Sequence, residues 1–264
     1  ELTSLNVSAG IFRQNLPMIL LAQRDDNRDL DQPWATHLVG EIEHLLSPDT
    51  RVTLDAYLKE YRDLPLDPEE PSLFTVDEAV YRYGFFFHHP ELVSSGRARA
   101  RGVELLLQKK LASNFYGLAS ASWSRSEYRG YDGEWRPRVF DNRWMGSLEG
   151  GYKPSEKWEF SLRWIYAGGP PYTPLDLEAS EASGRTVLDG SKVNESRYPA
   201  YHSLNLRFDR RFYFGGSNLV WYVSVWNAYN RKNVASYSWN AIKGEVQTTN
   251  QWGLLPIFGL EWEF

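Results

Sequence analysis

The chain lacks cysteine entirely, lacks an excess of basic residues and lacks any long hydrophobic run. Without cysteine there is no disulfide scaffold, no thiolate catalysis and no Cys-ligated zinc or iron–sulfur site. The 29 basic and 34 acidic residues give a formal net charge of -5, which argues against a sequence-independent nucleic-acid binder. The longest apolar run, residues 16–22, is far shorter than the ~18 residues of a membrane-spanning helix.

Aromatic residues, in contrast, are abundant for so polar a chain. They make up 15% of the 264 residues, although the mean hydropathy is only -0.51. A polar, aromatic-rich chain without membrane helices is still compatible with a membrane protein if the chain forms a β-barrel. The first residues, 1–4, include no initiator methionine or targeting segment, which indicates a mature chain or a piece of a longer one.

Side chains alternate between apolar and polar with a period of two residues. In the segment 158–166, Trp158, Phe160, Leu162, Trp164 and Tyr166 share one face, and polar residues fill most of the other. The same alternation recurs in 5–11, 52–59, 203–209, 219–226 and 258–264. The pattern predicts ten strands, roughly 4–14, 34–46, 51–63, 96–111, 114–128, 139–153, 157–168, 199–213, 218–240 and 252–264.

The predicted connections alternate between long and short. The long loops are 15–33, 64–95, 129–138, 169–198 and 241–251, and the short turns are 47–50, 112–113, 154–156 and 214–217. Such a rhythm is typical of an up-and-down meander with tight turns at one rim and long loops at the other, as in outer-membrane barrels. A soluble antiparallel protein would show the same alternation of side chains, but Greek-key crossings would mix its loop lengths.

Several of these strands are longer than the ~5–6 residues usual in globular proteins, as a tilted membrane-spanning sheet requires. Hydrocarbon cannot hydrogen-bond backbone groups, so a sheet that crosses it must close into a barrel. The apolar face then contacts lipid and the polar face contacts the lumen. The sequence therefore predicts an all-β, antiparallel, up-and-down transmembrane β-barrel.

The last strand resembles the C-terminal assembly signal of outer-membrane proteins. Such signals end in an aromatic residue, with another aromatic residue two positions earlier and a glycine five positions earlier. Phe264, Trp262 and Gly259 match, and Ile257 departs from the polar residue usual at its position. The resemblance implies that the barrel-assembly machinery recognises this strand.

Three upstream segments resemble strands of the TonB-dependent outer-membrane receptors. Residues 95–105 contain a G-x-A-x-G-x-E-like strand, 225–232 resemble the penultimate strand of the family, and 198–207 resemble the strand before it. The resemblance spans essentially the whole chain. It implies an N-terminal plug inside a barrel of about 22 strands, of which this chain supplies about ten and no plug. Residues 1–264 are accordingly interpreted as the C-terminal part of such a barrel.

Three interpretations of the missing strands remain open. The chain is the C-terminal fragment of a longer receptor, or one part of a barrel completed by another polypeptide, or a ten-stranded barrel closed on itself. In the first two, the partners are the lipid bilayer, the remaining strands and the plug. An inner-membrane energy-coupling complex acts indirectly through the plug, and the location is the outer membrane of a Gram-negative-type bacterium.

The long loops hold the candidate ligand-binding residues, because functional residues favour loops on a rigid scaffold. These candidates are Tyr81, Tyr83, Phe85, Phe87, His88, Trp135 and Tyr172. The alternative is that the aromatic loops pack on themselves. Adjacent histidines in an extended chain point to opposite faces, so His88 and His89 do not predict a metal site.

Charged residues on the polar faces of the strands form a second group of candidates. Half-buried charges need partners, and in a plugged barrel the plug or the inner wall supplies them. The lumen- or plug-facing candidates are Glu104, Glu149, Arg163, Arg207 and Asp209.

Transport is the function that the resemblance implies: energy-dependent uptake of a scarce nutrient such as a siderophore, vitamin, glycan or peptide. No G-x-S-x-G, P-loop, dinucleotide fingerprint or H-E-x-x-H occurs, so neither an enzyme nor a cofactor is expected. The alternatives are a ten-stranded barrel with a protease or hydrolase site at its rim, and a non-transporting surface or adhesion barrel.

Overall fold

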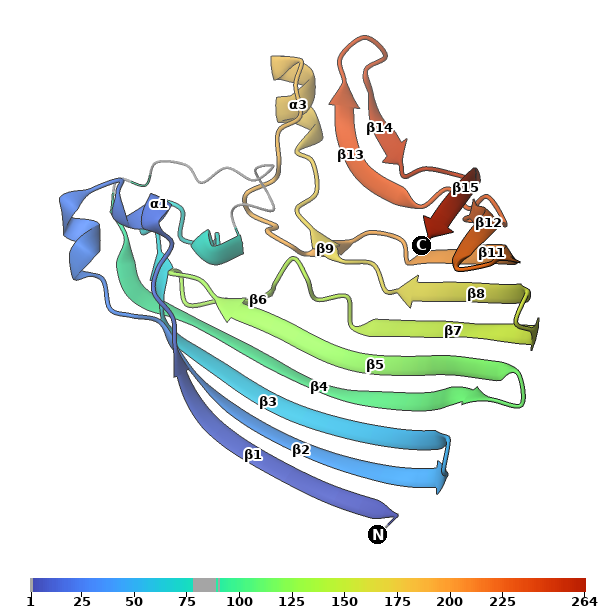
Figure 1. The fold of residues 1–264 in the computed structure, drawn as a ribbon. Coiled ribbons are helices and arrows are strands. Elements are labelled where there is room, and N and C mark those ends of the chain that lie inside the picture. The colour runs from blue at the N-terminus through green and yellow to red at the C-terminus, as the bar shows by residue number, and fades with distance from the viewer. Residues whose placement is uncertain (1, 78–88, 90) are drawn as a thin grey trace.

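The computed structural model describes residues 2–77, 89 and 91–264. Most of them form one curved antiparallel sheet, which confirms the predicted all-β class (Figure 1). Its strands follow one another in chain order, each paired with the next: β1 (Thr3–Arg13), β2 (Trp34–Ser47), β3 (Thr50–Leu66), β4 (Val93–Ala112), β5 (Phe115–Arg129), β7 (Trp144–Ser155), β8 (Trp158–Ala167), β11 (Tyr201–Phe214), β12 (Ser217–Trp226) and β15 (Leu255–Glu263). The short strand β6 (Trp135–Pro137) pairs with β5.

The remaining elements belong to the long connections: α1 (Met18–Leu21), the 3₁₀ turns η1 (Asp25–Asp29) and η2 (Thr75–Asp77), β9 (Pro171–Tyr172), α3 (Leu177–Ser183), β10 (Ser196–Arg197), β13 (Val234–Asn240) and β14 (Glu245–Asn250). They gather at one end of the sheet, whereas the β2–β3, β4–β5 and β7–β8 turns lie at the other (Figure 1). We name these ends the long-loop rim and the short-turn rim. In the described part of the chain, no helix is long and apolar enough to cross a membrane.

The strand predicted over 218–240 is wrong, because the chain leaves the sheet after Trp226. Asn227 and Asn230 adopt left-handed conformations with φ of 50° and 54°, which an asparagine tolerates better than most residues. The Asn227 side chain also bonds both backbone groups of Arg231. Beyond this turn β13 pairs with β14 in a separate hairpin, so the predicted loop 241–251 is largely strand and turn.

The register assigns opposite characters to the two faces of the sheet. Residues directly opposite one another on neighbouring strands share a face, and one such row is apolar: Ile42, Leu54, Leu105 and Ala121. The adjacent row, one residue along each strand, is polar: Glu41, Asp55, Glu104 and Ser122. We call the apolar side the outward face and the polar side the inward face.

Glycines opposite tyrosines let three aromatic rings lie flat on the inward face. Tyr57 faces Gly102, Tyr116 faces Gly151 and Tyr222 faces Gly259. A Cβ at Gly102 would lie 2.6 Å from the Tyr57 hydroxyl oxygen, and one at either of the other two glycines would overlap the facing ring. Such pairing of an aromatic ring with a cross-strand glycine fixes strand register.

The largest apolar cluster among the buried residues lies at the long-loop rim. There the segment after β3 folds over the sheet, and Phe74 stacks on Tyr128 with 4.7 Å between ring centroids. Tyr128 is fully buried and donates a hydrogen bond to the Ser72 carbonyl at 2.6 Å. The cluster comprises Leu64, Leu66, Phe74, Ala98 and Tyr128. Ala98 and Tyr128 lie opposite each other on the inward face, so the segment after β3 covers the inward side of the sheet.

The two edges of the sheet, β1 and β15, do not pair with each other. Within the described residues β1 pairs only with β2, and β15 pairs only with β12. The chain therefore forms an open curved sheet, contrary to the alternative of a ten-stranded barrel closed on itself.

Candidate functional site

The predicted aromatic loop cannot be placed, because Tyr81, Tyr83, Phe85, Phe87 and His88 lie outside the described residues. The two other predicted loop residues are located. Trp135 lies in β6, where the Arg99 guanidinium is 4.2 Å from its ring centroid. Tyr172 lies in β9, within the connection between β8 and β11.

Tyr172 belongs to a cluster of three tyrosine rings in contact at the long-loop rim, which we name the tyrosine cluster. Its ring centroid is 4.3 Å from that of Tyr198 and 5.4 Å from that of Tyr237, and the latter two are 5.3 Å apart. Tyr237 comes from β13, so the cluster fastens the β13–β14 hairpin to the β8–β11 connection. The Trp239 amide, which donates to the Thr186 hydroxyl at 2.9 Å, adds a second fastening.

A pocket of about 390 Å³ opens between two long connections at this rim, and we name it the rim pocket. One wall is the segment after β3, and the other is the connection between β8 and β11. The pocket combines two carboxylates and a histidine with apolar groups. Its lining is Glu69, Glu70, Pro71, Ser72, Leu73, Phe74, Thr75, His89, Thr173, Leu188, Gly190 and Val193.

His89 lines the rim pocket as part of a buried His–Asp pair. Its Nδ1 lies 2.7 Å from Asp67 Oδ2, and the two side chains are only 4% and 5% exposed. The other Asp67 oxygen accepts the Glu69 amide at 2.8 Å, and the His89 amide donates to Gln23. The pair thus joins three segments of the rim. Among the described residues no group of three or more His, Cys, Asp or Glu side chains could hold a metal ion.

Two ion pairs with buried carboxylates hold the long connections in place at this rim. Arg138 donates to both oxygens of Asp77, the longer contact being 3.1 Å. Arg197 bonds the carboxylate and the carbonyl of Asp141, and Asp141 also accepts the Ser126 amide at 2.9 Å. Sequence reasoning missed both pairs, because their members are 61 and 56 residues apart. Charge-assisted contacts of this kind hold loops more firmly than neutral hydrogen bonds do.

A second pocket, about 610 Å³, lies on the inward face beside the β13–β14 hairpin, and we name it the amide pocket. Asn227 and Asn233 are buried: Asn227 is bonded to the backbone of Arg231, and Asn233 is bonded to the backbone of His202 in β11. Asn250 and Gln251 are exposed. The lining is Arg163, Tyr201, Ser203, Asn205, Trp226, Asn227, Asn233, Asn250, Gln251, Trp252, Gly253 and Leu255. Amides, a hydroxyl and aromatic rings suit recognition of a polar molecule without reacting with it.

An exposed turn in the β8–β11 connection is ordered around Asp189. The Lys192 ammonium donates to Asp189 at 2.8 Å, and the Ser191 hydroxyl donates at 2.5 Å. These bonds favour the ionised carboxylate and lower the pKa of Asp189 to about 2.

The five residues predicted to face the lumen all lie on the inward face. Glu104 lies directly opposite Asp55, and Glu149 forms an ion pair with Arg163 at 2.9 Å. Arg207 and Asp209 pair at 2.6 Å along β11. Whether these groups contact a plug remains a prediction. The register also places a network on this face that includes Tyr116, Lys153, Glu159 and Arg211.

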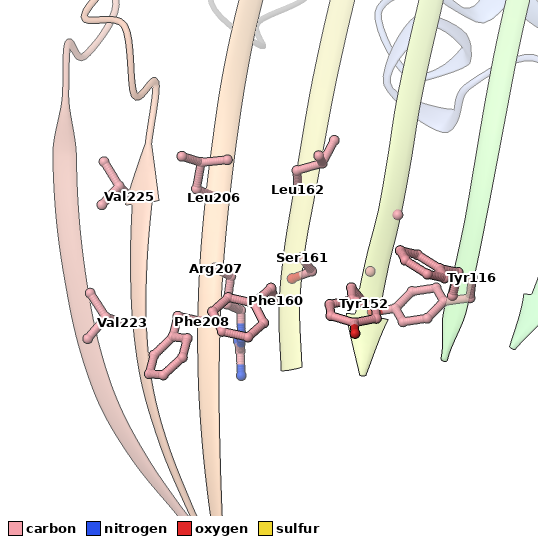
Figure 2. A pocket seen from close by; sticks show the side chains of 13 residues that line it. Tyr116, Tyr152, Phe160, Ser161, Leu162, Leu206, Arg207, Phe208, Val223 and Val225 are labelled. Atoms are coloured by element: carbon pink, nitrogen blue, oxygen red, sulfur yellow. The ribbon is translucent and has the colours of Figure 1, made fainter. Parts of the chain in front are cut away.

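The apolar hollow in Figure 2 is of a different kind, because most of the side chains that line it belong to the outward face. It measures about 580 Å³, and Gly150, which lies opposite Leu162 in the register, contributes no side chain to its lining. In the register, Leu206 and Phe208 on β11 face the same side as Leu162 and Phe160. The hollow is a depression in the surface that is predicted to contact lipid.

Comparison with known proteins decides the family. The family model described as the β-barrel of TonB-dependent-receptor-like proteins matches residues 42–225. This chain belongs to that family. The resemblance of its strand motifs to TonB-dependent receptors is thereby confirmed. Comparison with curated protein sequences finds no match.

Solved TonB-dependent receptors share the fold of this chain. The ferric citrate transporter FecA aligns with a TM-score of 0.69 and 13% identity, over 100% of this chain and 36% of FecA. The ferripyoverdine receptor of the outer membrane of Pseudomonas aeruginosa gives 0.66 and 12%, over 100% and 31%. The ferric-catecholate import receptor Fiu from K12 E. coli gives 0.65 and 10%, over 99% and 33%. The chain thus spans about a third of the length of these proteins.

Proposed function

We propose that this chain is the barrel portion of an outer-membrane receptor that takes up a scarce nutrient by TonB-dependent transport. Family membership carries the proposal. The structure supports it with two pockets at the long-loop rim, one between the loops and one on the inward face. In outer-membrane barrels the long loops face the cell exterior, so both pockets are proposed to open where a nutrient would arrive.

The chemistry of the two pockets supports binding rather than catalysis. A rim hydrolase would need a His–Asp couple that reaches substrate and water. The one such couple among the described residues, His89 with Asp67, is only 4% and 5% exposed and is tied to Gln23 and the Glu69 amide. Siderophores, vitamins, glycans and peptides are the proposed cargo classes, and their recognition would require hydrogen bonds and aromatic contacts only.

The open edges of the sheet support the proposed partners. Unpaired backbone groups on β1 and β15 would be costly in hydrocarbon, so about twelve further strands are proposed to complete a barrel of about 22. A plug is proposed to cover the inward charges and to connect with the inner-membrane energy-coupling complex. The barrel-assembly machinery is proposed to recognise Gly259, Trp262 and Phe264 in and after β15.

Uptake by cells that lack the receptor gene tests the proposal. Such cells, starved in turn of iron, cobalamin, glycans and peptides, should lose uptake of one cargo and regain it from a plasmid copy. Uptake should also disappear when the energy-coupling complex is inactivated. Unchanged uptake of every cargo in the deletion strain, or uptake that continues without energy coupling, would contradict transport by this receptor.

A further inference from the structure

The outward face of β4 and β5 carries a dense group of arginines at its long-loop end. Alternation along β4 places Arg97, Arg99 and Arg101 on the same face as Val103 and Leu105. Their direct partners on β5 are Arg129, Glu127 and Arg125, in that order. All five arginines are exposed. We name the five arginines, with Glu127, the arginine patch.

The arginine patch holds more positive charge than its own carboxylate can neutralise. Glu127 pairs with Arg99 at 2.8 Å and with Arg125 at 2.6 Å. Within the described residues, Arg97 and Arg101 form no ion pair, and Arg129 bonds only the Gly133 carbonyl. Arg97 lies opposite Arg129, and Arg101 lies opposite Arg125. Like charges at directly opposed positions destabilise a sheet unless an anion lies between them.

The patch adjoins the apolar surface without a gap. The next outward pair toward the short-turn rim is Val103 with Trp123, and it is followed by Leu105 with Ala121. Trp144 lies beside Trp123 and is 59% exposed, as expected of an aromatic residue at a membrane interface. Arginines directly above such a band lie at the level of lipid headgroups.

We propose that the arginine patch binds the phosphate groups of a phosphorylated lipid in the leaflet on the long-loop side. The acyl chains of that lipid lie along the apolar band below. A guanidinium binds phosphate through two parallel hydrogen bonds, and a phosphate between opposed arginines removes their repulsion. An acidic soluble protein would satisfy the charges but not the adjoining apolar surface. The inference rests on the membrane placement within the proposed function.

Lipid binding by the complete receptor in detergent tests this inference. The probes are lipid A (an acylated glucosamine disaccharide with two phosphates), the same lipid without phosphates, and inorganic phosphate. The variant is R97Q/R101Q, which removes the two arginines that have no ion pair among the described residues. Loss of even one charge-assisted contact lowers affinity about tenfold, so we expect the variant to bind lipid A at least ~10-fold more weakly.

The matched control is R210Q, because Arg210 shares the outward face but lies toward the short-turn rim, 3.9 Å from the Trp158 ring centroid. This variant should bind lipid A as the wild type does. Equal binding of lipid A by R97Q/R101Q and the wild type would overturn the inference. Equal binding of the phosphate-free lipid by the wild type would also overturn it, and that arm does not depend on how the variant folds.

The other outcomes separate the lipid from the transport proposal. If inorganic phosphate binds as tightly as lipid A, the site is a simple anion site and the lipid inference is wrong. If the wild type ignores lipid A while cargo uptake is normal, the inference is wrong and transport stands. If lipid A binds as expected but no cargo is taken up, the inference stands and transport fails.

Discussion

Single residues determine how closely the inward face of this sheet is packed. The Tyr116 ring lies over Gly151 on the neighbouring strand and donates its hydroxyl to Glu159 at 2.5 Å. A glycine at 151 is predicted by neither alternation nor turn chemistry. The requirement for a glycine at 151 becomes visible only when the paired strands place this residue opposite Tyr116, so the sequence alone could not reveal the requirement.

Gly151→Ala should therefore destabilise the receptor, because the new methyl group would overlap the Tyr116 ring. Overpacking of this kind costs about 1–3 kcal/mol. The measurement is the free energy of urea unfolding of the complete receptor in detergent. Gly40→Ala is the control, since a Cβ at Gly40 in β2 has nothing within 4 Å. Equal stability of the two variants would contradict the proposed packing of the ring.

Burial should also determine how much each of two ion pairs contributes to the stability of the receptor. Arg197→Gln leaves the Asp141 carboxylate, 1% exposed, without its main partner and should cost about 3–5 kcal/mol. Arg163→Gln breaks the pair with Glu149, whose side chains are 57% and 43% exposed, and should cost less than about 1 kcal/mol. Urea unfolding measures both losses. A loss at Arg163 as large as that at Arg197 would show that burial does not determine the difference.

At the scale of elements, the sequence predicted the strands of the sheet well and one hairpin poorly. Alternation is a local property, so it identified strands such as β8 and β11 directly. It failed after Trp226, because residues 234–240 continue an alternating pattern while Asn227 and Asn230 turn the chain away. The His89–Asp67 pair was equally inaccessible, since it depends on the path of a long loop.

The β13–β14 hairpin should lose its fixed position when the tyrosine cluster is broken. Tyr237→Ala removes two ring contacts, each worth about 0.5–1.5 kcal/mol beyond simple burial. Hydrogen exchange of a peptide covering 234–250 should accelerate roughly two- to twelvefold if only one such contact holds the hairpin. Tyr237→Phe keeps the ring and should exchange as the wild type does. An unchanged rate in Tyr237→Ala would mean that the cluster does not hold the hairpin.

At the scale of the whole molecule, the contrast between the two faces of the sheet explains most of the structure. The outward face is apolar and mostly uncovered, the inward face is charged and hydrogen-bonded, and the pockets proposed for cargo open at the rim that carries the long loops. The sequence predicted this contrast because it follows from a period of two. The arginine patch marks where the outward face stops being apolar.

The absence of cysteine makes the central claim directly measurable. Spin labels at Leu105→Cys and Glu104→Cys occupy neighbouring positions on opposite faces of β4. In the complete receptor in lipid bilayers, with no other cysteine present, the label at 105 should collide with dissolved oxygen and be shielded from a water-soluble nickel chelate. The label at 104 should lack that contact with lipid. Equal access of the nickel chelate to both labels would contradict a membrane-facing outward surface.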